Sequence, residues 1–365
     1  MANKMCLIAL ESASKIGTKV DNILSKWRHG EHFLTKVECP RFNNGEAKGI
    51  IQDSIRDKDV YILVDVCNTS ITYKMFGETN KMSPDDHYQD LKRIIAACNG
   101  KASRITVIMP FLYEGRQHRK AIRESLDCAI MLRELEQMGV HSILTFDAHD
   151  DRMQNAVPLM ALENISPALQ FTQALLCEYE DLQLDNEHMM FIAPDEGATG
   201  RAVFLASLFG VNIGMFYKRR DYTRIVNGTN PVIAHDFCGT SVKNKDVIVI
   251  DDIIASGGSM LDTTKQLKEM GAKRVFVFAT FGLFTNGLDK FDKAFDDKWF
   301  DRIFTTNLIY QRPELLKRKY YFSVRMDQYI AAIINELNKG HALQELTKPA
   351  HRIHDMVTIY KNNEN

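Results

Sequence analysis

Two adjacent aspartates, Asp251 and Asp252, stand between a short apolar run and a stretch of very small residues. The apolar run, residues 247–250, is typical of a buried strand, and ligands bind at the carboxyl ends of such strands in open α/β sheets. Backbone N–H groups in a small-residue turn can surround a phosphate, and the N-terminus of a following helix adds positive charge. The sequence therefore predicts a phosphate-binding loop beside the two carboxylates, made of Ala255, Ser256, Gly257, Gly258 and Ser259.

The alternative is a strand-end acid and a helix cap over an ordinary Gly-Gly turn. Buried acids need compensating partners, which an ordinary turn does not supply. Paired acids directly before such a loop resemble the binding motif shared by phosphoribosyltransferases and phosphoribosyl diphosphate synthases. In those families the acids hold the ribose 2- and 3-hydroxyls and the loop holds the 5-phosphate, so the resemblance implies a ribose 5-phosphate site.

Four further segments place charged side chains at the ends of expected strands. Residues 113–120 (YEGRQHRK) form a cationic loop, and residues 144–151 (LTFDAHDD) end an apolar run with acids around a histidine. Residues 193–201 (APDEGATGR) repeat the order of strand, turn and helix start. Residues 216–224 (FYKRRDYTR) open a stretch that reaches residue 244, and loops longer than about 15 residues are often functional lids. Taken singly, these segments also fit a solvated basic loop, a structural histidine or a charged surface.

Together and in this order, the segments resemble those of the ribose-phosphate diphosphokinase (phosphoribosyl diphosphate synthase) family, as a divergent member. The resemblance spans residues 6 to about 342. It implies the following roles: ATP binding by Phe42, Asn44, Glu46, Arg116, Gln117 and His149; sugar binding by Asp195 together with Asp251, Asp252 and the phosphate loop; Mg2+ binding by Asp147, His149 and Asp195; and catalysis by Lys218 and Arg220 on a flexible loop. In the family, the segment matched by Phe42 reaches the adenine from a neighbouring subunit, which implies a homo-oligomer with the ATP site at a subunit interface.

The chain departs from the family pattern at several positions. His118 stands where the family usually has Asp, Gly200 where better-known members have Lys, and Ala255 where many members have an acid. Arg123 to Ser125 replaces a common Arg-Ala-Pro, and residues 291–301 (FDKAFDDKWFD) have no obvious counterpart.

Short apolar runs alternate with amphipathic stretches along the chain, which predicts an α/β fold built of βαβ units around parallel sheets. We expect strands at 5–10, 60–66, 105–109, 142–146, 189–193, 213–216, 247–250 and 274–279, and helices at 12–27, 84–98, 122–138, 200–208 and 257–270. With the resemblance, this predicts two similar phosphoribosyltransferase-type domains, each with a mainly parallel sheet flanked by helices. We place an ATP-contacting domain at 1–164, a ribose 5-phosphate-binding domain at 165–340 and a partly disordered tail at 341–365.

Composition limits the class of protein. A chain of 365 residues is longer than a single hydrophobic core usually holds, and 45% of its residues are hydrophobic, which favours two globular domains. A formal net charge of -1 creates no overall electrostatic field that would attract nucleic acid or an anionic membrane, so we expect neither as a partner. Seven cysteines without a CxxC pair argue against a disulfide framework or a zinc site. The run of apolar residues near the N-terminus is too short to be the hydrophobic segment of a signal peptide, so we expect a cytoplasmic protein.

The resemblance implies transfer of the pyrophosphoryl group of ATP to the 1-hydroxyl of ribose 5-phosphate, which yields phosphoribosyl diphosphate for nucleotide biosynthesis and AMP. Two alternatives stay open. A phosphoribosyltransferase would share the sugar motif without needing the ATP segments, and a non-catalytic regulatory homologue would tolerate the departures at Gly200 and Ala255.

Overall fold

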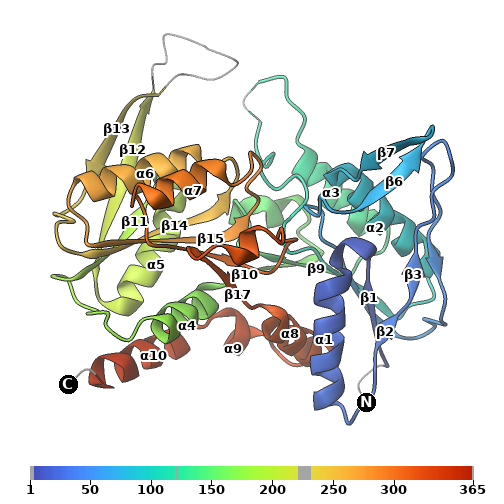
Figure 1. Cartoon of the computed structure of the whole chain (residues 1–365). Coiled ribbons are helices and arrows are strands. Elements are labelled where there is room, and N and C mark those ends of the chain that lie inside the picture. The colour runs from blue at the N-terminus through green and yellow to red at the C-terminus, as the bar shows by residue number, and fades with distance from the viewer. Residues whose placement is uncertain (1–3, 121, 221–231, 364–365) are drawn as a thin grey trace. The chain divides into compact units, whose positions relative to one another are not determined.

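The computed structural model of the chain describes residues 4–120, 122–220 and 232–363, except for the side chains of 218–220, 232–235 and 363 (Figure 1). These residues form two compact units. The first consists of Met1–Pro167, Asn307–Tyr310 and Arg325–Lys348, and the second of Ala168–Thr306, Gln311–Val324 and Pro349–Asn365. Each unit contains its own sheet and its own core.

The first unit contains a six-stranded sheet with the order β10-β9-β8-β5-β1-β2, in which every pairing is parallel. Its strands are β1 (Met5–Ala9), β2 (Leu34–Thr35), β5 (Asp59–Leu63), β8 (Arg104–Ile108), β9 (Ser142–Phe146) and β10 (Ala161–Ile165). The helices α2 (Pro84–Cys98) and α3 (Asp127–Gln137) pack into one core with alternate residues of the central strands. On the other face, α1 (Ser14–Trp27) contacts β1 and packs against α8 (Asp327–Lys339).

Two small hairpins extend this unit. The strands β3 (Val37–Glu38) and β4 (Ile50–Ile51) form one hairpin, and β6 (Thr72–Met75) and β7 (Glu78–Lys81) form the other. Helix α2 begins with a capping box, in which the Ser83 hydroxyl accepts from the Asp86 N–H and the Asp86 carboxylate accepts from the Ser83 N–H. Short 3-10 turns lie at η1 (Glu11–Ala13) and η2 (Asp151–Ala156), and α9 (Gln344–Thr347) follows α8.

The second unit contains a seven-stranded sheet with the order β13-β12-β11-β14-β15-β16-β17, parallel except for the edge pair β12 and β13. Its strands are β11 (Met189–Ala193), β12 (Asn212–Arg220), β13 (Val232–Cys238), β14 (Asp246–Ile254), β15 (Arg274–Gly282), β16 (Arg302–Thr306) and β17 (Tyr321–Val324). Helices α4 (Ala168–Glu178), α5 (Thr199–Phe209) and α10 (Ala350–Asn363) cover one face. Helices α6 (Gly258–Glu269) and α7 (Asp289–Asp296) lie on the other (Figure 1). Short 3-10 turns lie at η3 (Glu196–Ala198) and η4 (Leu315–Lys317).

The α/β class and the helix-flanked, mainly parallel sheets are confirmed, and every strand and helix that the sequence predicts is present. Strands β14 and β15 read as continuous apolar runs because both of their faces are buried. The predicted helix 122–138 begins only at Asp127, because Leu126 has a non-helical backbone (φ -117°, ψ 68°). The segment expected as a tail forms α9 and α10, and α10 is held by buried Ile353 and Val357.

The stretch between the expected strands 213–216 and 247–250 differs from the long loop that the sequence predicts. Strand β12 continues to Arg220, and β13 pairs with it antiparallel. The cationic residues Lys218, Arg219 and Arg220 end the apolar run of β12, and an edge pair does not need the apolar alternation of a buried strand.

Candidate functional site

The two aspartates lie at the end of β14 in the second unit, as the apolar run before them predicts. Asp252 is buried with 6% exposure, and its N–H donates to Asp251 Oδ1 at 2.9 Å. Strand β11 pairs with β14, and Asp195 lies just after the end of β11. The Asp195 carboxylate caps η3 by accepting from the Gly197 N–H at 3.0 Å. The structure therefore brings three predicted sugar-site carboxylates to one edge of this sheet.

The electrostatics of this cluster are dominated by negative charge. Burial raises the pKa of Asp251 well above its ordinary value, and the charges of Asp252 and Asp195 raise it further. One cation comes from α5, where Arg201 Nη2 lies 3.7 Å from Asp252 Oδ2. A ligand that offers hydroxyl donors, together with a cation, would stabilise the charged form of Asp251.

The predicted phosphate loop connects β14 to α6. Gly257 has φ 82°, a conformation that favours glycine, and a Cβ at this position would lie 2.1 Å from Phe291 Cζ. On the other side, the Thr285 N–H donates to the Ala255 carbonyl at 3.0 Å. Ser256, Gly258 and Ser259 are exposed, so the side of the loop that would face a phosphate is accessible.

The segment without a family counterpart, residues 291–301, supports this loop. It begins inside α7, and the buried Phe291 ring packs against Gly257 and edge-on against Phe284, with ring centroids 4.8 Å apart. Sequence reasoning missed this role because 34 positions separate Phe291 from Gly257.

The departure at Gly200 leaves open space. Gly200 is an exposed residue in the first turn of α5, and a Cβ built there meets no atom within 4 Å. The structure could therefore accept the lysine that better-known family members have at this position.

The predicted ATP segments of the first unit lie at the ends of the neighbouring strands β8 and β9. In the loop after β8, the Gln117 amide donates to the Ser125 carbonyl at 3.0 Å and to the Arg119 carbonyl at 3.2 Å. These bonds fold the loop back on itself and leave the Arg116 side chain exposed. Tyr113 anchors the start of the loop by stacking on Tyr88, with ring centroids 4.5 Å apart.

Histidine 118 connects this loop to the end of β9. His118 Nε2 lies 3.3 Å from Asp150 Oδ2, and its ring centroid lies 5.3 Å from that of His149. Arg152 also binds Asp150, and its guanidinium holds the pKa of Asp150 well below the ordinary value. The loop that carries Arg116 and Gln117 is thus joined through His118 to the turn that carries His149, and Asp150 is a contact that sequence reasoning missed.

Asp147 lies directly after β9 with φ 43°, an uncommon backbone conformation that clusters at functional sites. Its N–H donates to the Ile165 carbonyl at 3.0 Å, and the next N–H, of Ala148, donates to Asn164 Oδ1 at 2.9 Å. Strand β10 thereby fixes the turn that carries Asp147 and His149.

The segment with Phe42, Asn44 and Glu46 forms the exposed tip of the β3–β4 hairpin. The Phe42 N–H donates to the Glu46 carbonyl at 2.7 Å, and Asn44 Nδ2 donates to Glu46 Oε2 at 2.7 Å. Phe42 remains 54% exposed. The tip therefore presents one aromatic ring and two polar side chains to solvent.

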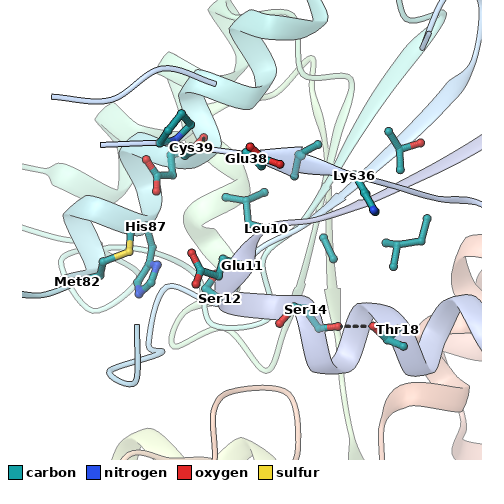
Figure 2. A pocket seen from close by; sticks show the side chains of 16 residues that line it. Leu10, Glu11, Ser12, Ser14, Thr18, Lys36, Glu38, Cys39, Met82 and His87 are labelled. Atoms are coloured by element: carbon teal, nitrogen blue, oxygen red, sulfur yellow. Dashed lines mark hydrogen bonds between the residues drawn. The ribbon is translucent and has the colours of Figure 1, made fainter. Parts of the chain in front are cut away.

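A cavity of about 620 Å³ lies at the base of this hairpin (Figure 2). Glu38 and Cys39 enter it from the β3 side, Met82 and His87 from the start of α2, and Glu11 from the turn after β1. Burial and the charge of Asp90 raise the pKa of the Cys39 thiol to about 12, so this thiol is unreactive at neutral pH. The sequence contains no signal for this cavity.

The predicted catalytic cations lie at the end of β12. Their backbone pairs with β13, as Lys218 with His235 and Arg220 with Val232, but their side chains lie outside the described residues. The register shifts between Arg219 and Arg220, so strict alternation cannot assign faces at this point.

Within the described ranges, no three His, Cys, Asp or Glu side chains gather into a ready metal centre. The predicted donors are still of the kind that magnesium accepts. Asp147 and Asp195 offer hard carboxylate oxygens, and Mg2+ usually binds one or two carboxylates and retains several waters. His149 is better suited to orienting the groups around Mg2+ than to binding the ion directly.

Comparison with known proteins agrees with this arrangement. Residues 5–139 match the N-terminal domain of ribose phosphate pyrophosphokinase, and residues 161–318 match the phosphoribosyl transferase domain. A ribose-phosphate pyrophosphokinase of Mycoplasma genitalium is 30% identical over 302 residues, 82% of each chain. The chain belongs to the ribose-phosphate pyrophosphokinase family.

Further relatives have the same name. The enzyme of Ureaplasma parvum is 26% identical and covers 84% of each chain, and that of Vibrio parahaemolyticus is 26% identical and covers 86% of this chain and 91% of its own. The phosphoribosylpyrophosphate synthetase of Mycobacterium smegmatis has the same fold, with a TM-score of 0.74, 21% identity, and coverage of 92% of this chain and 99% of its own. In the described part of the chain, no helix is long and apolar enough to span a bilayer.

Proposed function

We propose that this chain is a ribose-phosphate diphosphokinase, which transfers the β,γ-pyrophosphoryl group of ATP to the anomeric hydroxyl of ribose 5-phosphate. The products are phosphoribosyl diphosphate, for nucleotide biosynthesis, and AMP. One observation carries the proposal: Asp251 and Asp252 lie near the end of β14, two residues before a loop of small residues, beside Asp195 just after the end of β11. Membership of the family supports it.

In the proposal, the second unit binds ribose 5-phosphate. Asp251 and Asp252 accept hydrogen bonds from the 2- and 3-hydroxyls, and the Arg201 guanidinium lies 3.7 Å from the Asp252 carboxylate. The N–H groups and hydroxyls of the loop from Ala255 to Ser259 bind the 5-phosphate at the N-terminus of α6. Asp195 lies beside the sugar.

The first unit binds ATP. Arg116 and Gln117 face the triphosphate from the loop after β8, and His149 faces it from the end of β9. Phe42, Asn44 and Glu46 contact the adenine of an ATP bound to another copy of the chain, which makes the working enzyme a homo-oligomer. Exposure of the hairpin tip supports this part of the proposal.

Magnesium belongs to the proposal as the cofactor, with Asp147, His149 and Asp195 as the residues that would hold it. When bound, Mg2+ neutralises phosphate charge. The chain's own residues position the reactants, because transfers of this type depend mainly on positioning and charge neutralisation.

The reaction is an in-line displacement at the β-phosphorus. The O1 atom of the sugar forms a bond to that phosphorus and releases its hydroxyl proton to solvent, the bond from the phosphorus to the α,β-bridging oxygen breaks, and AMP leaves with the electron pair. Lys218 and Arg220 neutralise the charge that develops on the pyrophosphoryl group. Exclusion of water from the closed site prevents hydrolysis in place of transfer.

A cytoplasmic location is part of the proposal. All seven cysteines are free thiols in the structure, in keeping with a compartment that keeps thiols reduced.

The test is an assay of the purified chain with ATP, Mg2+ and ribose 5-phosphate. We expect AMP and phosphoribosyl diphosphate in equal amounts. AMP should be absent when ribose 5-phosphate is omitted. An absence of AMP over a range of inorganic phosphate concentrations would contradict the proposal, and ATP-independent use of phosphoribosyl diphosphate with a base would indicate a phosphoribosyltransferase.

A further inference from the structure

Phe76 occupies an unusual place at the tip of the β6–β7 hairpin. It has φ 52° and is followed by Gly77 with φ 84°, and the flanking residues Met75 and Glu78 pair directly. A two-residue turn with two positive φ values favours Asn-Gly or Asp-Gly, and a bulky aromatic side chain in this conformation is strained. The ring is also 79% exposed to solvent. Neither turn geometry nor core packing accounts for a phenylalanine here.

The hairpin tip is joined to the tip of the neighbouring β3–β4 hairpin. The Phe76 N–H donates to the carbonyl of Asn43, the residue next to Phe42, at 2.8 Å. Met75 approaches Gly45 so closely that a Cβ on Gly45 would lie 2.6 Å from the Met75 sulfur. Gly45 has φ 92°, a backbone conformation that favours glycine. The two tips are therefore held as one surface.

The base of this surface is rigid as well. The Arg41 guanidinium lies over the Tyr73 ring at 4.7 Å and binds Asp90 of α2 at 2.9 Å. Arg93 holds the other oxygen of Asp90 at 2.6 Å. These contacts link β6 to the β3–β4 hairpin through buried charged groups, so the positions of the two tips depend on each other.

We propose that Phe76 is a second aromatic contact for the nucleobase of ATP, beside Phe42. This inference rests on the proposed function of the Phe42–Glu46 tip. Phe42 is 54% exposed and Phe76 is 79% exposed, and Asn44 and Glu46 of the same tip carry exposed amide and carboxylate groups. Flat aromatic rings with amide and carboxylate groups at their edge suit a heterocyclic base, which stacks on the rings and hydrogen-bonds at its edge. The strained backbone at Phe76 is the cost of presenting the ring.

The most informative variant is Phe76→Asn, because asparagine favours the positive φ of this turn. If Phe76 served only the fold, this change would leave ligand binding intact and keep or raise the thermal unfolding temperature. If Phe76 stacks on the base, ATP affinity should fall about 10-fold, the typical effect of losing one stacked ring. Phe76→Trp should retain the affinity, and Ile359→Asn, an equivalent loss of an exposed apolar side chain on α10, should change nothing.

The measurement is calorimetric binding of ATP and of inorganic tripolyphosphate to the full-length protein, with sedimentation of each variant. We expect the loss in Phe76→Asn for ATP and not for tripolyphosphate, which lacks a base, at unchanged oligomeric state. In the assay, the KM for ATP should rise while kcat and the KM for ribose 5-phosphate stay unchanged.

Two results would overturn the inference while leaving the proposed function intact. One is an ATP affinity within twofold of wild type in Phe76→Asn. The other is a change in sedimentation without a change in ATP affinity, which would make Phe76 a contact between copies. Conversely, a wild-type chain that binds ATP through Phe76 but forms no AMP would retain this inference and refute the proposed function. A wild-type chain that does not bind ATP would refute both.

Discussion

Gly257→Ala is the sharpest structural test of the phosphate loop, because two separate penalties act at this residue. Its φ of 82° costs an L-residue roughly 1–2 kcal/mol. The new Cβ would lie 2.1 Å from Phe291 Cζ, and Phe291 is only 1% exposed, so its ring has little room to move. Overpacking of this kind costs roughly 1–3 kcal/mol. We expect the variant to lose about 2–5 kcal/mol of unfolding free energy if both penalties are felt.

The steric part can be separated from the backbone part by a second change. Phe291→Leu shortens the side chain that the Cβ meets, so the double variant should recover roughly 1–3 kcal/mol relative to the sum of the single variants. The backbone penalty should remain. Gly258→Ala is the matched control for stability, because its Cβ meets nothing within 4 Å and it begins α6.

The assay is urea unfolding of the four variants and the wild type, with the KM for ribose 5-phosphate measured in parallel. Displacement of the loop in Gly257→Ala should raise that KM more than the KM for ATP. Wild-type stability in Gly257→Ala, or additivity of the two changes within about 0.5 kcal/mol, would refute the packing of Phe291 against the loop.

Three further predictions concern charge. Asp251→Asn should raise the unfolding temperature of the ligand-free protein above pH 7, since it removes a carboxyl whose pKa burial raises, and should also weaken ribose 5-phosphate binding; a lower unfolding temperature or an unchanged affinity would refute the account. Burial raises the pKa of Asp65 to about 7, so the folded state keeps a proton that the unfolded state releases as the pH rises. The unfolding free energy of the wild type, measured relative to Asp65→Asn, should therefore fall by on the order of 4 kcal/mol between pH 4 and pH 7. Urea unfolding of both proteins across that range is the measurement. Arg220→Ala should lower kcat about 100- to 1,000-fold with little change in calorimetric ATP affinity, and Arg220→Lys should recover little of it; an unchanged kcat would remove Arg220 from catalysis.

The sequence predicts those parts of the site that local patterns determine. The run 247–250 is apolar because β14 is buried on both faces, so the position where polarity returns places Asp251 and Asp252 near the end of the strand, which continues to Ile254. The same reasoning places Asp147 after β9 and Asp195 after β11. Within one sheet, parallel strands carry their carboxyl ends to the same edge, which is why Asp195 could be assigned to the same site as Asp251 and Asp252.

Contacts between distant segments could not be predicted in this way. Arg201 meets Asp252 only because α5 follows β11 and β11 pairs with β14. Phe291 meets Gly257 across a strand and a loop, and Asp65 accepts the Tyr310 N–H at 2.6 Å from a segment 245 positions away. The hydrophobic periodicity of a single sequence does not predict these long-range contacts, because each depends on how a complete sheet and its helices pack.

The cluster at the end of β14 connects stability with the proposed chemistry. Asp252 is buried beside half-buried Asp251, Asp195 adds a third carboxylate, and Arg201 places a guanidinium 3.7 Å from Asp252. Apolar or amide side chains at these positions would make the ligand-free fold more stable, because the charged form of Asp251 is disfavoured there. A ribose diol donates two hydrogen bonds to the carboxylates, and a divalent cation supplies the missing positive charge. Binding therefore compensates the carboxylate charge that is unfavourable in the ligand-free fold. The affinity for ribose 5-phosphate should accordingly rise with pH as Asp251 loses its proton.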